Sequence, residues 1–77
     1  MADPRLVAVG HRIREIRKAK GPTQEGLALL SGIDRGYMGH IERGEKNATL
    51  VTIFTICGSL CISPAELFND LSIEISN

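Results

Sequence analysis

Tryptophan is absent from this chain of 77 residues, and its aromatic residues are only one tyrosine and two phenylalanines. A core of this size is marginally stable alone, so dimerisation would help to stabilise it. No apolar run approaches the roughly 18 residues of a membrane span, and the N-terminal segment MADPRL has no apolar signal-peptide region. These absences predict one domain over residues 1–77, located in a reducing cytoplasm, with no membrane partner.

Cysteine is also scarce, and motifs that carry chemistry are missing. Cys57 and Cys61 are too few for a disulfide scaffold, and we interpret both as buried, inert thiols rather than as a redox switch. These cysteines and the two histidines, His11 and His40, lack the spacing of zinc ligands. The sequence contains no phosphate-binding glycine loop, no HExxH motif and no nucleophile paired with a base. We therefore expect no metal, no cofactor and no enzymatic activity.

The net charge is zero, but the charged residues are unevenly distributed. Residues 1–46 contain all nine basic residues and six acidic ones, a balance of +3, whereas residues 47–77 contain three acidic residues and no basic ones. Binding to DNA responds to local positive potential rather than to the net charge of the chain. The distribution predicts a basic half that faces DNA and a neutral-to-acidic half that faces elsewhere.

Capping residues and hydrophobic spacing predict five helices. Asp3-Pro4 opens the first helix, which ends before Gly21-Pro22. Thr49 caps the fourth helix, and a capping box from Ser63 to Glu66 opens the fifth. The positions expected to face the core are Leu6, Val9, Ile13 and Ile16 in the first helix, Leu50, Ile53, Phe54, Cys57 and Leu60 in the fourth, and Leu67, Phe68 and Leu71 in the fifth. The tail 71–77 alternates apolar and polar residues, which fits either a short edge strand or a frayed helical end.

The segment from Thr23 to Gly44 is the most informative part of the chain. It contains two short helical patterns separated by Ser31-Gly32, and Asp34 is placed to cap the second helix. The apolar positions of the two helices are Leu27, Ala28 and Leu30 in the first and Tyr37, Met38 and Ile41 in the second. Two helices of this length joined by a turn with glycine predict a helix-turn-helix, whose second helix lies in the major groove of DNA.

Four segments of the sequence resemble the lambda-repressor/Cro-like, or Xre, helix-turn-helix family. They are RIREIRKAKG at 12–21, TQEGLALLSGI at 23–33, YMGHIERG at 37–44 and LCISPAELF at 60–68. The resemblance implies an all-α, five-helix, lambda-repressor-like DNA-binding domain with its helix-turn-helix at 23–44. A narrower similarity connects the chain with the small controller proteins of restriction–modification systems. It consists of Asp34-Arg35-x-Tyr37, Ile41-Glu42-Arg43 and Asn47.

Glycines at three positions depart from the family pattern. Gly26, Gly36 and Gly39 stand where serine, threonine, glutamate or longer residues are usual. Each glycine inside a helix costs about 0.5–1 kcal/mol relative to alanine, so the second helix of the motif should be locally weak. At Gly36 and Gly39, only a close approach of the backbone to the groove floor would give a contact with a base.

The resemblance implies distinct roles for the polar residues of this region. Base contacts are expected from Arg35, Gly36, Gly39 and His40, and for His40 a phosphate contact or simple solvation is an equal alternative. Contacts with the DNA backbone are expected from Thr23, Gln24, Asp34, Tyr37, Arg43, Lys46 and Asn47. Arg17 and Glu42 are expected to form a buried structural ion pair. Arg12 and Arg14 are each either phosphate contacts or solvated, and Glu25 is a candidate contact with RNA polymerase.

The expected partners are an operator in double-stranded DNA and a second copy of the chain. The dimer is expected to form through a region from about residue 49 to 77, where Gly58 permits a close approach of helices. Its interface is expected to include Val51, Thr52, Thr55, Ile56, Ser59 and Ile62, and apolar Ile73 and Ile75 also need cover. A homodimer implies a palindromic operator. No small-molecule effector is expected. The alternative is an antitoxin-type interaction protein, which is disfavoured because only about seven residues follow the fifth helix.

Overall fold

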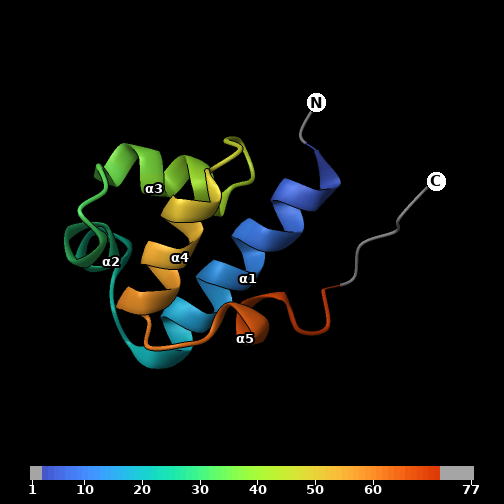
Figure 1. Ribbon diagram of the computed structural model, residues 1–77. Helices are drawn as coiled ribbons and strands as arrows, with labels where there is room; N and C mark the ends of the chain where they lie inside the picture. The colour runs from blue at the N-terminus through green and yellow to red at the C-terminus, as the bar shows by residue number, and fades with distance from the viewer. Residues whose placement is uncertain (1–2, 72–77) are drawn as a thin grey trace.

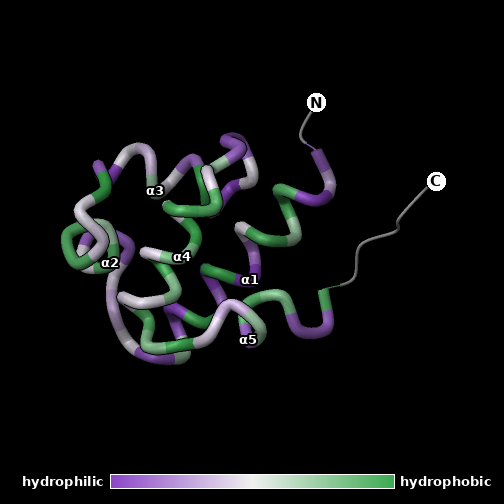
Figure 2. The backbone as a smooth tube through the Cα atoms, in the orientation of Figure 1, coloured by the Kyte–Doolittle hydropathy of each residue, from purple (hydrophilic) through white to green (hydrophobic). Residues whose placement is uncertain are grey.

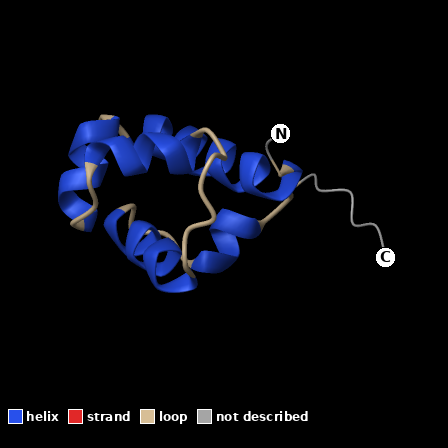
Figure 3. Cartoon of the chain, turned by 90° about the horizontal axis from the view of Figure 1, so that it is seen from above, coloured by secondary structure: helices blue, strands red, loops and turns tan. Residues whose placement is uncertain are grey.

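A computed structural model describes residues 3–71 of the chain and places five helices along them. They are α1 (Pro4–Lys20), α2 (Gln24–Ser31), α3 (Arg35–Glu42), α4 (Leu50–Ser59) and α5 (Pro64–Phe68). The described residues contain no strand (Figure 3), so the prediction of an all-α, five-helix fold is confirmed. None of these helices is long and apolar enough to cross a membrane. The alternating pattern of the tail lies outside the described residues from position 72 onward.

Each helix begins where the sequence predicts it, because each has a side-chain cap. The capping oxygens belong to Asp3, Thr23, Asp34, Thr49 and Ser63, and each accepts a backbone N–H from the first turn of its helix. Ser63 and Glu66 form the complete capping box. Such caps supply partners to backbone groups that a helix end would otherwise leave unpaired.

Two glycines shape the ends of the helix-turn-helix. Gly32 follows α2 with φ of 64°, a left-handed conformation that glycine adopts without a steric penalty. Gly44 follows α3 with φ of 74°, and a Cβ atom there would lie 2.5 Å from Cα of Val7. The chain therefore turns sharply after α3 while it stays in close contact with α1.

The helices surround a single aliphatic core. In Figure 1, α2 and α3 lie on one side of the molecule, α4 runs through the middle, and α1 and α5 close the other side. Figure 2 shows that α4 is largely hydrophobic, whereas the loop that follows α3 is hydrophilic. The buried core residues are Ile13, Leu27, Ala28, Met38, Ile41, Ile53, Ile56, Cys57, Leu60, Ile62 and Leu67.

Gly10 allows α1 and α3 to approach closely. A Cβ atom on Gly10 would lie 2.3 Å from the carbonyl oxygen of Ile41 and 2.7 Å from that of Glu42. No side chain larger than hydrogen fits in that space. The last turn of α3 is consequently positioned by direct backbone packing on the middle of α1.

The core stripe of α4 differs from the predicted one. The structure buries Ile53, Ile56 and Cys57, with Leu60 following at the end of the helix, so the prediction that Leu50 and Phe54 face the core is wrong. The prediction that Ile56 contacts a partner is also wrong, because its side chain is fully buried within the monomer. Ile62, at 8% exposure, likewise belongs to the core. Periodicity alone left the rotation of this apolar helix undetermined, because nearly every face of it is hydrophobic.

Three further side chains point outward against expectation. Leu30 is 66% exposed, because α2 turns Leu27, Ala28 and Ser31 inward instead. Phe68 is 43% exposed beside the buried Leu67. Cys61 is exposed rather than buried, and it has a positive φ of 57° in the turn after α4. Only Cys57 is the buried thiol that the sequence predicts, and burial raises its pKa.

Candidate nucleic-acid interface

A buried ion pair fixes the end of α3 against α1. Arg17 Nε donates to Glu42 Oε2 at 2.7 Å and Arg17 Nη2 donates to Glu42 Oε1 at 3.1 Å, while the third donor, Nη1, reaches the carbonyl oxygen of Pro22. The two side chains are 9% and 1% exposed. Buried charges are tolerated when they are paired and fully hydrogen-bonded, as they are here. The predicted structural pair is therefore present, and it joins α1, the segment before α2, and α3.

Gln24 is a member of the same network. Its side-chain nitrogen donates to Glu42 Oε1 at 3.0 Å, which gives this carboxylate oxygen a second donor. An amide nitrogen has two hydrogens, so one remains for a phosphate at the start of α2. Thr23 caps the helix beside it by accepting the backbone N–H of Gly26. The site expected to bind a phosphate is thus held in place by the ion pair.

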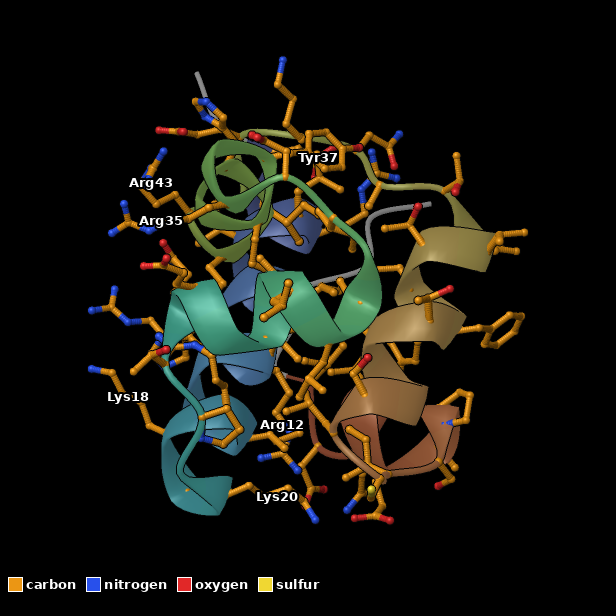
Figure 4. All side chains as sticks on the ribbon, turned by 90° about the vertical axis from the view of Figure 1, so that its left-hand side faces the viewer. Arg12, Lys18, Lys20, Arg35, Tyr37 and Arg43 are labelled. Atoms are coloured by element: carbon orange, nitrogen blue, oxygen red, sulfur yellow. The ribbon has the colours of Figure 1, made fainter. Side chains whose placement is uncertain are left out.

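The outer face of α3 carries the exposed basic groups. Arg35 occupies the first turn, its side chain is 69% exposed, and its Nε lies 3.9 Å from Glu25 Oε2. Figure 4 shows Arg35 and Arg43 projecting to the same side of the molecule, with Lys18 below them. Tyr37 is partly buried against the core. Asp34 accepts the backbone N–H of Tyr37 at 3.1 Å, which directs its carboxylate into the helix cap.

The two glycines of α3 differ in their surroundings. Gly36 is exposed, as a close approach to DNA requires. Gly39 is buried, and a Cβ atom built on it would lie 3.1 Å from Arg43 Nη1 and 3.3 Å from Gln24 Oε1. The side chains of Arg43 and Gln24 lie over the backbone of Gly39, so its expected base contact, which stays a prediction, would require them to move. The missing side chain instead makes room for the guanidinium of Arg43.

His40, Arg43 and Glu45 form a cluster that the sequence did not reveal. His40 Nδ1 lies 2.7 Å from Glu45 Oε1, and Arg43 Nε donates to the same oxygen at 3.0 Å. These hydrogen bonds, first from His40 and then from Arg43, hold the pKa of Glu45 below its ordinary value. Glu45 follows the end of α3, so its position in the sequence has no helical spacing to His40. Its contacts depend on the turn at Gly44.

The remaining basic residues are distributed over two surfaces. Arg12 is half-buried and its Nη2 donates to the carbonyl oxygen of Glu66 at 3.2 Å, so it links α1 to α5. Arg14 is exposed on α1. Lys46 and Asn47 are exposed in the loop after α3. Lys46 also lines a shallow hollow with Leu6 and Leu50, so it lies near α1 and α4 as well as after α3.

The fold and this surface define a helix-turn-helix protein, with α2 supporting and α3 presented to the solvent. The chain belongs to the helix-turn-helix family HTH_3, whose model matches residues 13–67. That range extends from Ile13 in α1 to Leu67 in α5, so the family match includes the whole motif, the second half of α1, α4 and most of α5.

Several relatives are controller proteins of restriction–modification systems. The crystal structure of the controller protein C.AhdI from Aeromonas hydrophila is 52% identical over 86% of this chain and all of that one, with a TM-score of 0.84. The control protein C.MunI from a Mycoplasma species is 35% identical over 69 residues, which are 88% of this chain and 93% of the relative. The controller protein C.Esp1396I, solved as a tetramer with its natural operator of 35 base pairs, is 39% identical over 86% of this chain and 87% of that one, with a TM-score of 0.79. These findings do not favour the antitoxin alternative.

Proposed function

We propose that this protein is a sequence-specific regulator of transcription that binds double-stranded operator DNA in the cytoplasm and has no catalytic role. The observation that carries the proposal is the exposed face of α3. Its first turn presents Arg35, while the buried pair of Arg17 and Glu42 fixes its last turn to the scaffold. An arginine in this position of a recognition helix matches the O6 and N7 acceptors of guanine. The controller relatives support the same function.

The residues around α3 fit contacts with the sugar-phosphate backbone. Gln24 at the start of α2 keeps one amide hydrogen free, and the exposed Lys46 and Asn47 follow α3 in sequence. Such contacts set the position of a protein on the duplex but carry no sequence information themselves. Selection of bound sites from random duplex DNA tests the proposal. A recurrent motif supports it, and an unenriched pool of bound sequences contradicts it.

We propose that the protein acts as a homodimer through the outer face of α4. Val51 is 73% exposed and Phe54 is 54% exposed, so two large apolar side chains lie on the surface of one helix. Thr52 and Thr55 adjoin them, and Gly58 leaves open space on the same helix. Exposed apolar patches of this kind mark interaction sites. The operator should then be palindromic, with half-site centres about 34 Å apart.

Charged substitutions in this patch test the dimer. Phe54→Asp should convert the protein to a monomer in sedimentation experiments at high micromolar concentration, because it places a charge in an apolar contact. Leu29→Asp is a matched control, since Leu29 is 82% exposed on α2 rather than on α4. A wild-type protein that sediments as a monomer at that concentration contradicts the proposal. Footprints without dyad symmetry on the selected site contradict the palindromic operator.

We propose further that the protein is an autoregulatory controller of a restriction–modification system. Several of its relatives are control or controller proteins, which supports this subtype. Its own concentration would then be the signal, without a small-molecule effector. Tandem operators upstream of its own gene should give activation at low occupancy and repression at high occupancy.

Glu25 is the proposed contact with RNA polymerase, since its side chain is 76% exposed on α2. Glu25→Gln should abolish activation in a transcription assay and spare binding to the operator. A fall in DNA binding contradicts this role. Because Glu25 lies near Arg35, the binding titration must accompany the transcription assay for the same variant.

A further inference from the structure

The contacts of His40 determine which of its ring nitrogens carries hydrogen. Nδ1 lies 2.7 Å from Glu45 Oε1, and the same nitrogen lies 3.2 Å from Nη2 of Arg43. It cannot donate to the carboxylate and accept from the guanidinium at once. An ionised carboxylate only accepts hydrogen bonds, so a bare nitrogen at 2.7 Å would repel it. The shorter contact therefore places the hydrogen on Nδ1.

Whenever the His40 ring is neutral, Nε2 is then the ring nitrogen without hydrogen. Among residues 3–71, Nε2 of His40 has no hydrogen-bond partner. It is also not one of the buried polar atoms that lack a partner. The His40 side chain is 45% exposed on α3, one turn after Gly36. In the Nδ1–H tautomer, Nε2 is an acceptor. Nε2 can therefore accept a hydrogen bond from a donor outside the protein.

Arg43 reduces the repulsion that the carboxylate of Glu45 would exert on DNA phosphates. Its Nε donates to the same Glu45 oxygen at 3.0 Å, and its guanidinium lies over Gly39. The positive charge of Arg43 thereby compensates the negative charge of Glu45. The cluster offers DNA the acceptor of His40 rather than a bare acid.

We propose that Glu45 is a specificity-determining positioning residue that selects the Nδ1–H tautomer of His40, so that Nε2 reads a base with an exocyclic amino group in the major groove. This inference rests on the proposed DNA-binding function. In the major groove, the amino donors are N4 of cytosine and N6 of adenine, whereas guanine O6 and thymine O4 are acceptors. An acceptor at His40 consequently favours cytosine or adenine at one position of each half-site and disfavours guanine and thymine, which present acceptors and no amino donor there.

The first test needs no DNA. The ¹⁵N chemical shifts of the His40 ring at pH 8.5 distinguish the two neutral tautomers in the free protein. We expect the Nδ1–H form in the wild type and a mixture of tautomers in Glu45→Gln, because a glutamine amide can either accept or donate a hydrogen bond. The Nε2–H form in the wild-type protein would overturn the inference while leaving the proposed function intact.

The second test measures base preference at pH 8.5 by substituting each base pair of a selected half-site. The wild type should prefer cytosine or adenine at one position by about tenfold, a typical cost of a mismatched pair. His40→Ala should remove that preference, and Glu45→Gln should reduce it to about twofold or less. In the His40→Ala background, Glu45→Gln should have no further effect on preference.

A matched control separates this role from a change in net charge. Glu15 Oε2 lies 3.8 Å from Nε2 of His11 on α1, too far for a hydrogen bond, so Glu15→Gln removes the same charge beside another histidine without changing a hydrogen bond to its ring. It should leave the preference unchanged. Full preference in Glu45→Gln, or a preference unaffected by His40→Ala, would overturn the inference. A wild type without preference at any position would instead contradict the proposed function.

Discussion

Alanine in place of Gly10 should strongly destabilise the fold. The new Cβ would lie 2.3 Å from the carbonyl oxygen of Ile41, which is more than 1 Å inside an ordinary contact, and its neighbours are backbone atoms that cannot rotate away. Overpacking of this kind costs about 1–3 kcal/mol or more. The gain in helix propensity returns only about 0.5–1 kcal/mol. The net effect is a loss of stability, because α1 and α3 must separate.

Gly58 provides the matched control, since it also lies inside a helix but has open space around the position of its Cβ. Because Gly58 lies in the proposed dimer patch, both substitutions are compared in the Phe54→Asp background, where Gly58→Ala should stabilise the monomer by about 0.5–1 kcal/mol through helix propensity alone. In thermal unfolding followed by circular dichroism, about 1 kcal/mol corresponds to a shift of roughly 4–8 °C for a domain of this size. The two substitutions should therefore move the midpoint in opposite directions. A Gly10→Ala protein as stable as its Phe54→Asp parent would refute the close packing of α1 on α3.

The remaining predictions concern charged groups. Glu42→Leu should destabilise the protein by about 3–5 kcal/mol in urea unfolding, because Arg17 is left buried without its carboxylate. The double substitution Arg17→Met with Glu42→Leu should recover much of that loss. An equal loss of stability in the single and the double variant would contradict the pairing. Hydrogen bonds from Arg5 lower the pKa of Asp3 to about 2, so its contribution to stability is present above pH 4 and is lost as the pH falls toward 2. Arg5→Ala should raise that pKa toward 3.8 in an NMR titration, and an unchanged value would contradict the contact. His40→Ala should raise the lowered pKa of Glu45 in the same kind of titration, whereas a further fall would contradict the hydrogen bond from His40.

Much of the fold could be predicted from the sequence because its signals are local. Each of the five helices has a side-chain cap immediately before it, and these caps alone locate the helix starts. The end of α2 follows from a glycine in a left-handed conformation. The rotation of α4 could not be predicted. Val51 and Phe54 are as apolar as Ile53 and Ile56, so only the packing of the other helices decides which pair is buried.

Contacts of the candidate site could be predicted from the sequence only where the family pattern specifies the residues that make them. The pair of Arg17 and Glu42 follows from that pattern, although 25 residues separate its members in sequence. The role of Arg12 was not predictable, because its acceptor is a backbone carbonyl 54 residues away. Glu45 was missed because its contacts arise from a turn rather than from helical spacing. Interactions made by loops and by backbone carbonyls leave little signal in a single sequence.

The role of Arg35 can be tested directly by the ratio of affinities for the selected operator and for scrambled DNA. Arg35→Ala should lower operator affinity by about 1–3 kcal/mol per half-site and relax the preference at one position of each. Lys46→Ala is the comparison. Loss of a phosphate contact should lower the affinity for both DNAs alike, and it should reduce the slope of log affinity against log salt concentration by about one. The account predicts that the ratio falls for Arg35→Ala and is kept for Lys46→Ala. An equal loss on both DNAs for Arg35→Ala would contradict sequence recognition by the exposed face of α3.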